Sequence, residues 1–131
     1  MNIQQILGEK EIVPVFQPIV SLENGDILGY EICSHLNDKP ITEYFEKAEE
    51  LEKIWKLEKL CRKSILKKVK LIGLKKNIFI NINPDIIFDE DFYQGYTLKL
   101  LEKFSLEPNQ IIFEITENCS QKNEETLSRL I

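Results

Sequence analysis

The sequence predicts an α/β protein with a mainly parallel sheet that begins with an antiparallel hairpin. Two strand-like stretches, 13–20 and 26–34, flank Asn24-Gly25, a pair that favours a tight hairpin turn because both residues accept positive φ. After this hairpin, helix and strand patterns alternate along the rest of the chain. Such alternation implies right-handed crossovers and parallel pairing of the later strands.

The individual elements follow from local patterns. Residues 2–8 predict a short leading helix, and residues 41–51 predict a second helix with Thr42 as its candidate N-cap. Apolar residues at helical spacing predict the longest helix over 54–72, which Gly73 would end. The remaining patterns predict a strand at 77–83, a helix near 95–104, a strand at 111–116 and a last helical segment at 123–131.

Length and composition limit the class of protein. The chain has 131 residues, enough for one domain, and its 43% hydrophobic and 30% charged residues are typical of a soluble globular protein. A net charge of −5 argues against binding to a nucleic-acid polymer. No apolar run reaches the roughly 18 residues of a membrane span, and no signal-peptide pattern is present. Cys33, Cys61 and Cys119 form no CxxC pair, so we expect reduced thiols and a cytoplasmic location.

Three predicted strands carry a polar side chain opposite their apolar face. Within 77–83, Asn81 alternates with isoleucines and therefore faces the other way. Glu31 and Glu114 are placed alike, each near the C-terminal end of its strand. A carboxylate in a buried sheet is costly unless a cation or another partner neutralises it. The three side chains form an oxygen-only ligand set, which suits Mg²⁺ or Mn²⁺ better than zinc.

Simpler structural roles remain open for the same residues. Any one of them, taken alone, is more often a solvated or hydrogen-bonded residue at a strand end than a metal ligand. Asn83-Pro84 is likewise typical of the start of a turn. The agreement in position across three strands is what favours a site, because α/β sheets bind ligands at the carboxyl ends of their strands.

Four short motifs resemble one known family. They are "VFQPIV" at 15–20, "GYEIC" at 29–33, "FININP" at 79–84 and "FEITE" at 113–117. In this order and at these intervals they resemble the EAL-domain family of bacterial cyclic-di-GMP phosphodiesterases. The resemblance implies a TIM-like barrel with one antiparallel strand. A whole barrel needs about 250 residues, so we expect residues 1–131 to be the N-terminal portion of a single EAL domain, a partial barrel without its second half.

The resemblance also assigns roles to individual residues. Glu31, Asn81 and Glu114 match the family's ligands for Mg²⁺ or Mn²⁺. Glu117 matches a catalytically important glutamate that steadies a loop beside the metal, and Gln17 matches a glutamine near the substrate. The family hydrolyses cyclic-di-GMP to the linear pGpG as part of bacterial second-messenger signalling.

Some positions depart from the family pattern. The E-A-L signature is Glu31-Ile32-Cys33 here, and the arginine that grips a substrate phosphate four residues after the glutamate is replaced by His35. A histidine cannot reproduce the bidentate fork of an arginine. The aspartate pair and the lysine of the family's second half have no counterpart in residues 1–131.

Two functions are therefore compatible with the sequence. The first is the N-terminal half of a cyclic-di-GMP phosphodiesterase, inactive by itself and with weak or no metal binding. The second is a degenerate EAL domain that binds cyclic-di-GMP or a protein partner without hydrolysis. In either case we expect a homo-oligomer, because a half barrel exposes strand edges that can pair with another chain.

Overall fold

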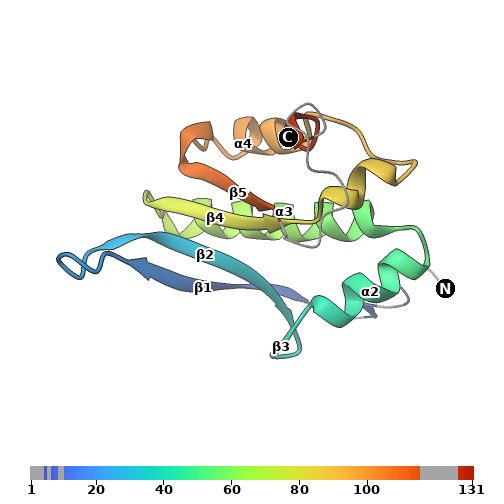
Figure 1. Ribbon diagram of the computed structural model, residues 1–131, viewed down its shortest axis with the longest axis horizontal. Helices are drawn as coiled ribbons and strands as arrows, with labels where there is room; N and C mark the ends of the chain where they lie inside the picture. The colour runs from blue at the N-terminus through green and yellow to red at the C-terminus, as the bar shows by residue number, and fades with distance from the viewer. Residues whose placement is uncertain (1–4, 6, 9–10, 116–126) are drawn as a thin grey trace.

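The structure is a computed structural model that describes residues 5, 7–8, 11–115 and 127–131. Its sheet has the strand order β1-β2-β4-β5, and a short strand, β3, pairs with β2. Figure 1 shows this sheet with the long helix α3 lying along one side of it. The strands are β1 (Ile12–Val20), β2 (Ile27–Leu36), β3 (Lys39–Pro40), β4 (Asn77–Ile82) and β5 (Ile111–Ile115). The helices are α2 (Thr42–Glu50), α3 (Ile54–Ile72) and α4 (Tyr96–Lys103), with 3₁₀ turns η1 (Pro84–Phe88) and η2 (Pro108–Gln110).

The predicted antiparallel hairpin is present, but its turn is wider than two residues. β1 and β2 pair antiparallel, and the connection is closed by a hydrogen bond of 2.8 Å from the Ser21 N–H to the Asp26 carbonyl. Gly25 has the positive φ that the sequence predicted, at 77°. Asn24 instead accepts the Asp26 N–H with its side chain, at 2.9 Å. Asn24 therefore forms an Asx turn and does not have the positive φ that the sequence also allowed at this residue.

The later strands pair in parallel, as the alternation of helices and strands predicted. The β2–β4 ladder runs only as far as Ile32 and Ile80, whereas the β4–β5 ladder continues to Ile82 and Ile115. β2 itself extends to Leu36, so its last residues run without β4 beside them. Figure 1 shows β2 curving away from β4 towards β3. The C-terminal ends of β2 and β4 are therefore not paired with each other.

The core lies between α3 and one face of the sheet. The helix has the predicted bounds and ends at Gly73, whose φ of 68° is left-handed, a conformation that favours glycine at this position. Ile78, Ile80 and Ile82 of β4 are fully buried against it, because a parallel strand covered by a helix presents alternate residues to that helix. The other buried apolar residues of this cluster include Ile32, Trp55, Ile65, Leu66 and Val69.

Two local predictions differ from the structure. Thr42 is not the N-cap of α2, since the cap position is Ile41 and no side chain caps the helix. Asn83 does not belong to the strand, which ends at Ile82. Asn83 is instead the N-cap of η1, where its side chain accepts the Asp85 N–H at 2.9 Å. The turn interpretation was therefore correct for Asn83, while Asn81 stays on the strand.

Parts of two predicted helices lie outside the described residues. Of 2–8, only residues 5 and 7–8 are described, and of 123–131 only residues 127–131. Among the described residues, no helix is long and apolar enough to cross a membrane.

Candidate metal-binding site at the strand ends

The structure brings Glu31, Asn81 and Glu114 onto one face of the sheet. Asn81 and Glu114 are direct partners in the β4–β5 ladder, and aligned residues of parallel strands point to the same side of a sheet. On β2, Glu31 precedes the buried Ile32, which is aligned with Ile80 in the β2–β4 ladder. Glu31 therefore faces away from α3, as Asn81 does between Ile80 and Ile82. The alternation in the sequence predicted this arrangement correctly.

One oxygen of the Glu31 carboxylate connects β2 with β4. The Asn81 Nδ2 group donates a hydrogen bond of 3.2 Å to Glu31 Oε1. The Cys33 thiol points to the same oxygen, with a Sγ to Oε1 distance of 3.9 Å, which is a weak interaction. With its amide turned this way, Asn81 keeps its Oδ1 atom available as an acceptor or metal ligand.

Two carboxylates share this small region. Burial, followed by the charge of Glu31, raises the pKa of the Glu114 carboxyl above its ordinary value. Glu114 Oε1 is shielded from solvent and accepts no hydrogen bond from the described residues, although the side chain as a whole is half-buried. Burial, then the charges of Glu31 and Glu114, also raises the pKa of the Cys33 thiol. A cation bound here would relieve this repulsion.

The donor atoms fit a hard divalent cation but supply only part of a coordination sphere. Glu31, Asn81 and Glu114 offer carboxylate and amide oxygens, and Mg²⁺ and Mn²⁺ prefer such ligands. The shielded oxygen of Glu114 is the feature that a cation would complete. Within the described ranges, however, no group of three or more His, Cys, Asp or Glu residues lies close enough together to hold a metal ion. An ion bound by this chain would therefore keep most of its water ligands.

The structure separates the two candidate substrate contacts. Gln17 on β1 is the direct partner of Glu31 in the antiparallel ladder, so both side chains lie on the same face. His35 shares that face but lies four residues further along β2, where its partners are Val13 and Pro40. Four residues of strand span about 13 Å, so His35 is not part of the group around Glu31. Glu117 lies outside the described residues.

A cavity of about 730 Å³ opens where β2 and β4 separate. The site residues Cys33, Asn81 and Glu114 line it, and Glu58 and Arg62 of α3 line it as well. The end of the β2–β4 ladder explains this cavity, because no strand fills the space between the last residues of the two strands. Two of the three candidate ligands, Asn81 and Glu114, therefore share one hollow with the buried side of α3.

The charged pair Glu58 and Arg62 of α3 was not predicted from the sequence. Both side chains are buried on α3, where Arg62 donates a hydrogen bond of 2.8 Å from its NH2 group to Glu58 Oε2. Glu58 Oε1 accepts the N–H of Asn83 at 2.9 Å, and Arg62 NH1 donates to Thr97 Oγ1 at 3.0 Å. The signal in the sequence is ambiguous, because a glutamate and an arginine four residues apart stand within the apolar stripe of the helix but are equally usual on a solvated helix face.

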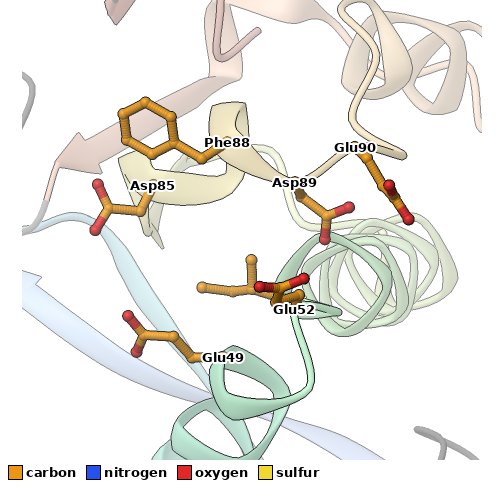
Figure 2. Close-up of a pocket in the computed structure, with 7 residues that line it drawn as sticks. Glu49, Glu52, Asp85, Phe88, Asp89 and Glu90 are labelled. Atoms are coloured by element: carbon orange, nitrogen blue, oxygen red, sulfur yellow. The ribbon is translucent and has the colours of Figure 1, made fainter.

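A second hollow, shown in Figure 2, is lined mainly by carboxylates and has a volume of about 450 Å³. Its best-buried carboxylate, Asp89, already has partners within the chain. Asp89 Oδ2 accepts the N–H of Trp55 at 3.0 Å, and Oδ1 accepts the N–H of Asp91 at 2.9 Å. Asp89 thus stabilises the N-terminus of α3, where a negative charge is favourable. The lining residues are Glu49, Glu52, Ile54, Asp85, Phe88, Asp89 and Glu90.

Comparisons with known proteins agree on one family. The sequence profile described as "EAL domain" matches residues 1–131. No curated protein matches the chain. Among solved structures, the chain is similar to the c-di-GMP complex of the PaMucR phosphodiesterase, with a TM-score of 0.70 and 22% identity over 87% of this chain and 50% of that one.

Two further structures have the same fold. A standalone EAL protein from Vibrio cholerae O395, bound to c-di-GMP, has a TM-score of 0.70 and 22% identity over 86% of this chain and 48% of that chain. Klebsiella pneumoniae BlrP1, in a complex with calcium and c-di-GMP, has a TM-score of 0.76 and 19% identity over 99% of this chain and 34% of that chain.

At such identities the likeness establishes the fold, and it confirms the expected partial TIM-like barrel. The chain spans half or less of the length of these solved chains. Because the family profile covers all of residues 1–131, this chain belongs to the EAL domain family.

Proposed function

We propose that this chain forms one half of the metal-dependent centre of a cyclic-di-GMP phosphodiesterase. The observation that carries the proposal is the convergence of Glu31, Asn81 and Glu114 on one face of the sheet, with a shielded Glu114 oxygen that accepts no hydrogen bond within the described part of the chain. Membership of the EAL family supports the reaction class. The solved chains of the same fold that hold c-di-GMP support the substrate.

The chain's residues have distinct roles in this proposal. Glu31 and Glu114 would hold Mg²⁺ or Mn²⁺ through carboxylate oxygens, and Asn81 would contribute its Oδ1 atom. A divalent cation held there would supply the chemistry that the hydrolysis to pGpG needs, which is a lowered water pKa and compensation of the phosphodiester charge. Gln17, opposite Glu31 in the ladder, contacts the nucleotide. Glu117 steadies a neighbouring loop, the role that the family pattern gives to its position.

The metal-binding half supplied here is not sufficient for turnover. The carboxylates around Glu31 need further ligands and a proton acceptor, and loss of part of such a cooperative site removes nearly all of the rate. We therefore expect purified residues 1–131 to form no pGpG from cyclic-di-GMP with Mg²⁺ or Mn²⁺. We propose a cytoplasmic location for the phosphodiesterase of which this chain forms one half, which agrees with the free thiols of Cys33 and Cys61.

The decisive experiment uses a longer protein, expressed from the gene beyond the codon for Ile131. Reading the gene past the codon for Ile131 shows whether an aspartate pair and a lysine follow. If they do, the extended protein should convert cyclic-di-GMP to pGpG in a chromatographic assay, and Glu31→Gln should abolish this conversion. The exposed Glu23→Gln substitution, in the hairpin turn, is the control and should leave the rate unchanged. An extended protein that is fully folded but inactive would contradict the catalytic proposal.

His35 supports a second candidate, a domain that binds cyclic-di-GMP without hydrolysis. This half-buried histidine stands where the family pattern has an arginine, and an imidazole cannot offer a phosphate the bidentate fork of a guanidinium. Titration calorimetry on the extended protein separates the candidates. Binding without pGpG formation favours the non-catalytic domain, whereas the absence of both contradicts either form of the proposal.

A further inference from the structure

β4 loses one of its neighbours just before the residue that completes the candidate site. Its ladder with β2 ends at Ile80, and Asn81 follows immediately. On the β5 side the ladder continues to Ile82, so among the described residues only β5 pairs with the end of β4. The hollow of about 730 Å³ occupies the position that a continued β2–β4 ladder would fill.

A buried carboxylate of α3 bonds the backbone at the end of β4, where β2 no longer pairs with it. Glu58 Oε1 accepts the N–H of Asn83, two residues after Asn81, at 2.9 Å. Glu58 reaches this position from α3 on the core side of the sheet, and its side chain is 5% exposed. Hydrogen bonds to a charged acceptor are among the stronger ones in proteins. The end of β4 is therefore attached to α3 at the point where its attachment to β2 has stopped.

Arg62 holds this carboxylate in place. Its side chain is 2% exposed, and its guanidinium donates hydrogen bonds to both Glu58 and Thr97. It also lies between two aromatic rings, 5.2 Å from the centroid of Trp55 and 5.0 Å from that of Phe113. An arginine with this many contacts has little freedom to move. The contacts leave the Glu58 carboxylate with a single orientation towards Asn83.

We propose that the Glu58–Arg62 pair positions Asn81 for metal binding, by holding the end of β4 beside Glu31 where the β2–β4 ladder has ended. Glu58 acts as a positioning residue, because it reaches Asn81 only through the backbone of Asn83. The hydrogen bonds of Arg62 go to Glu58 and Thr97, so Arg62 acts through Glu58. The inference uses the proposed function only in naming Asn81 as a metal ligand.

The test separates positioning from stability with a double variant, Glu58→Met/Arg62→Met. Replacing a buried ion pair with apolar side chains of similar size often leaves stability unchanged or higher, but it removes the acceptor of the Asn83 N–H. We expect the NMR signals of the Asn81 side-chain NH2 group to lose the shift caused by the hydrogen bond to Glu31. In a titration with Mn²⁺ alone, broadening of the Asn81 and Glu31 signals should need about tenfold more ion than in the wild type.

Thr97→Val is the matched control. It removes the hydrogen bond between Arg62 and Thr97 from the same buried network, keeps the side-chain volume and leaves the bond from Asn83 to Glu58 in place. It should lower the melting temperature without moving the Asn81 signals or the Mn²⁺ titration. Equal effects of Thr97→Val and the double variant would overturn the proposal, and so would unchanged Asn81 signals in a folded double variant.

A second variant decides the matter if the double variant does not fold. Glu58→Gln/Arg62→Met keeps a carbonyl acceptor for the Asn83 N–H and removes the guanidinium that would compete for this single oxygen, so the Asn81 signals should stay near their wild-type positions. Their displacement in a folded Glu58→Gln/Arg62→Met protein would overturn the proposal. If the wild-type chain shows no Mn²⁺ broadening at Asn81, the half site does not hold the ion by itself and the proposed function is decided by the extended protein, whereas the metal-free Asn81 signals still show whether Glu58 positions that side chain.

Discussion

Asn81 of β4 donates a hydrogen bond of 3.2 Å from Nδ2 to Oε1 of Glu31 on β2. This bond crosses between two strands whose ladder ended one residue earlier, at Ile80. Glu114, the partner of Asn81 on β5, brings a second carboxylate to the same place. The amide therefore lies between two negative charges and bonds one of them, while its own oxygen stays available. A divalent cation completes such an arrangement better than water does, because it attracts all three oxygens.

The first prediction concerns metal affinity. Three oxygen-bearing side chains leave a cation largely hydrated, so calorimetry should give a dissociation constant for Mg²⁺ or Mn²⁺ that is roughly millimolar or weaker. Glu31→Ala should remove this binding, because it removes the oxygen that accepts the hydrogen bond from Asn81. Glu23→Ala, an exposed substitution in the hairpin turn, should bind as the wild type does. A micromolar affinity that Glu31→Ala abolishes would show that the chain holds a complete site.

The second prediction concerns pH. Burial first, and the charge of Glu31 second, raise the pKa of Glu114. A carboxyl with a raised folded-state pKa contributes stability below its unfolded pKa of about 4.3, and this contribution is lost as the pH rises through the folded pKa. Glu114→Gln cannot ionise and avoids that loss. Its urea midpoint should exceed that of the wild type at about pH 7, and this advantage should disappear near pH 4.

An exposed substitution provides the control for the pH experiment. Glu102→Gln on α4 also removes one carboxylate from an exposed position, and it should leave the wild-type pH dependence of the urea midpoint in place. An equal midpoint difference between Glu114→Gln and the wild type at both pH values would contradict the electrostatic account of Glu114.

The third prediction concerns the close approach of β2 and β4. A Cβ atom on Gly29 would lie 2.6 Å from the carbonyl oxygen of Asn77 and 3.0 Å from Cε2 of Phe79. The backbone oxygen cannot move without breaking the ladder, so Gly29→Ala should lower the free energy of unfolding by about 1–3 kcal/mol. Leu28→Ala, next to it and 56% exposed, should change it by less than about 0.5 kcal/mol. Similar urea midpoints for the two variants would show that the strands separate easily.

Elements with a strong local pattern could be predicted from the sequence. The apolar spacing of α3 and the glycine after it gave both ends of that helix correctly. Alternation on β4 separated Asn81 from its buried neighbours, and the turn propensity of Asn83-Pro84 accounts for the end of the strand. β3 was missed although a signal existed. Asn37 and Asp38 both have positive φ, and these residue types favour a tight hairpin turn.

The partners of the site could not be predicted, because they depend on contacts between distant segments. The burial of Glu58 and Arg62 depends on Asn83 and Thr97, which lie 25 and 35 residues further along the chain. A charged pair at helical spacing is also the usual pattern of a solvated helix face. Only the packing of α3 against the sheet distinguishes the two cases.

The last prediction concerns assembly of this chain when it is expressed by itself. β5 lies at one edge of the described sheet, and an uncovered strand edge can pair with another chain. The face turned away from α3 also leaves Val13 and Val15 of β1 48% and 40% exposed, and exposed apolar patches of this kind favour association. Two copies related by a two-fold axis can cover both features in a closed assembly. We therefore expect a homodimer or a larger oligomer.

Light scattering at roughly tens of micromolar protein should report at least twice the monomer mass of 15.4 kDa. Ile115→Lys should shift the protein towards the monomer, because lysine on an edge strand opposes pairing with another strand. Leu22→Lys, in the exposed hairpin turn, adds the same charge away from that edge and should leave the mass unchanged. A wild-type chain that stays monomeric and soluble would show that the β5 edge is covered within a single copy. If both lysine variants dissociate the oligomer equally, net charge and not the β5 edge controls association, because the extra positive charge is all that the two variants share.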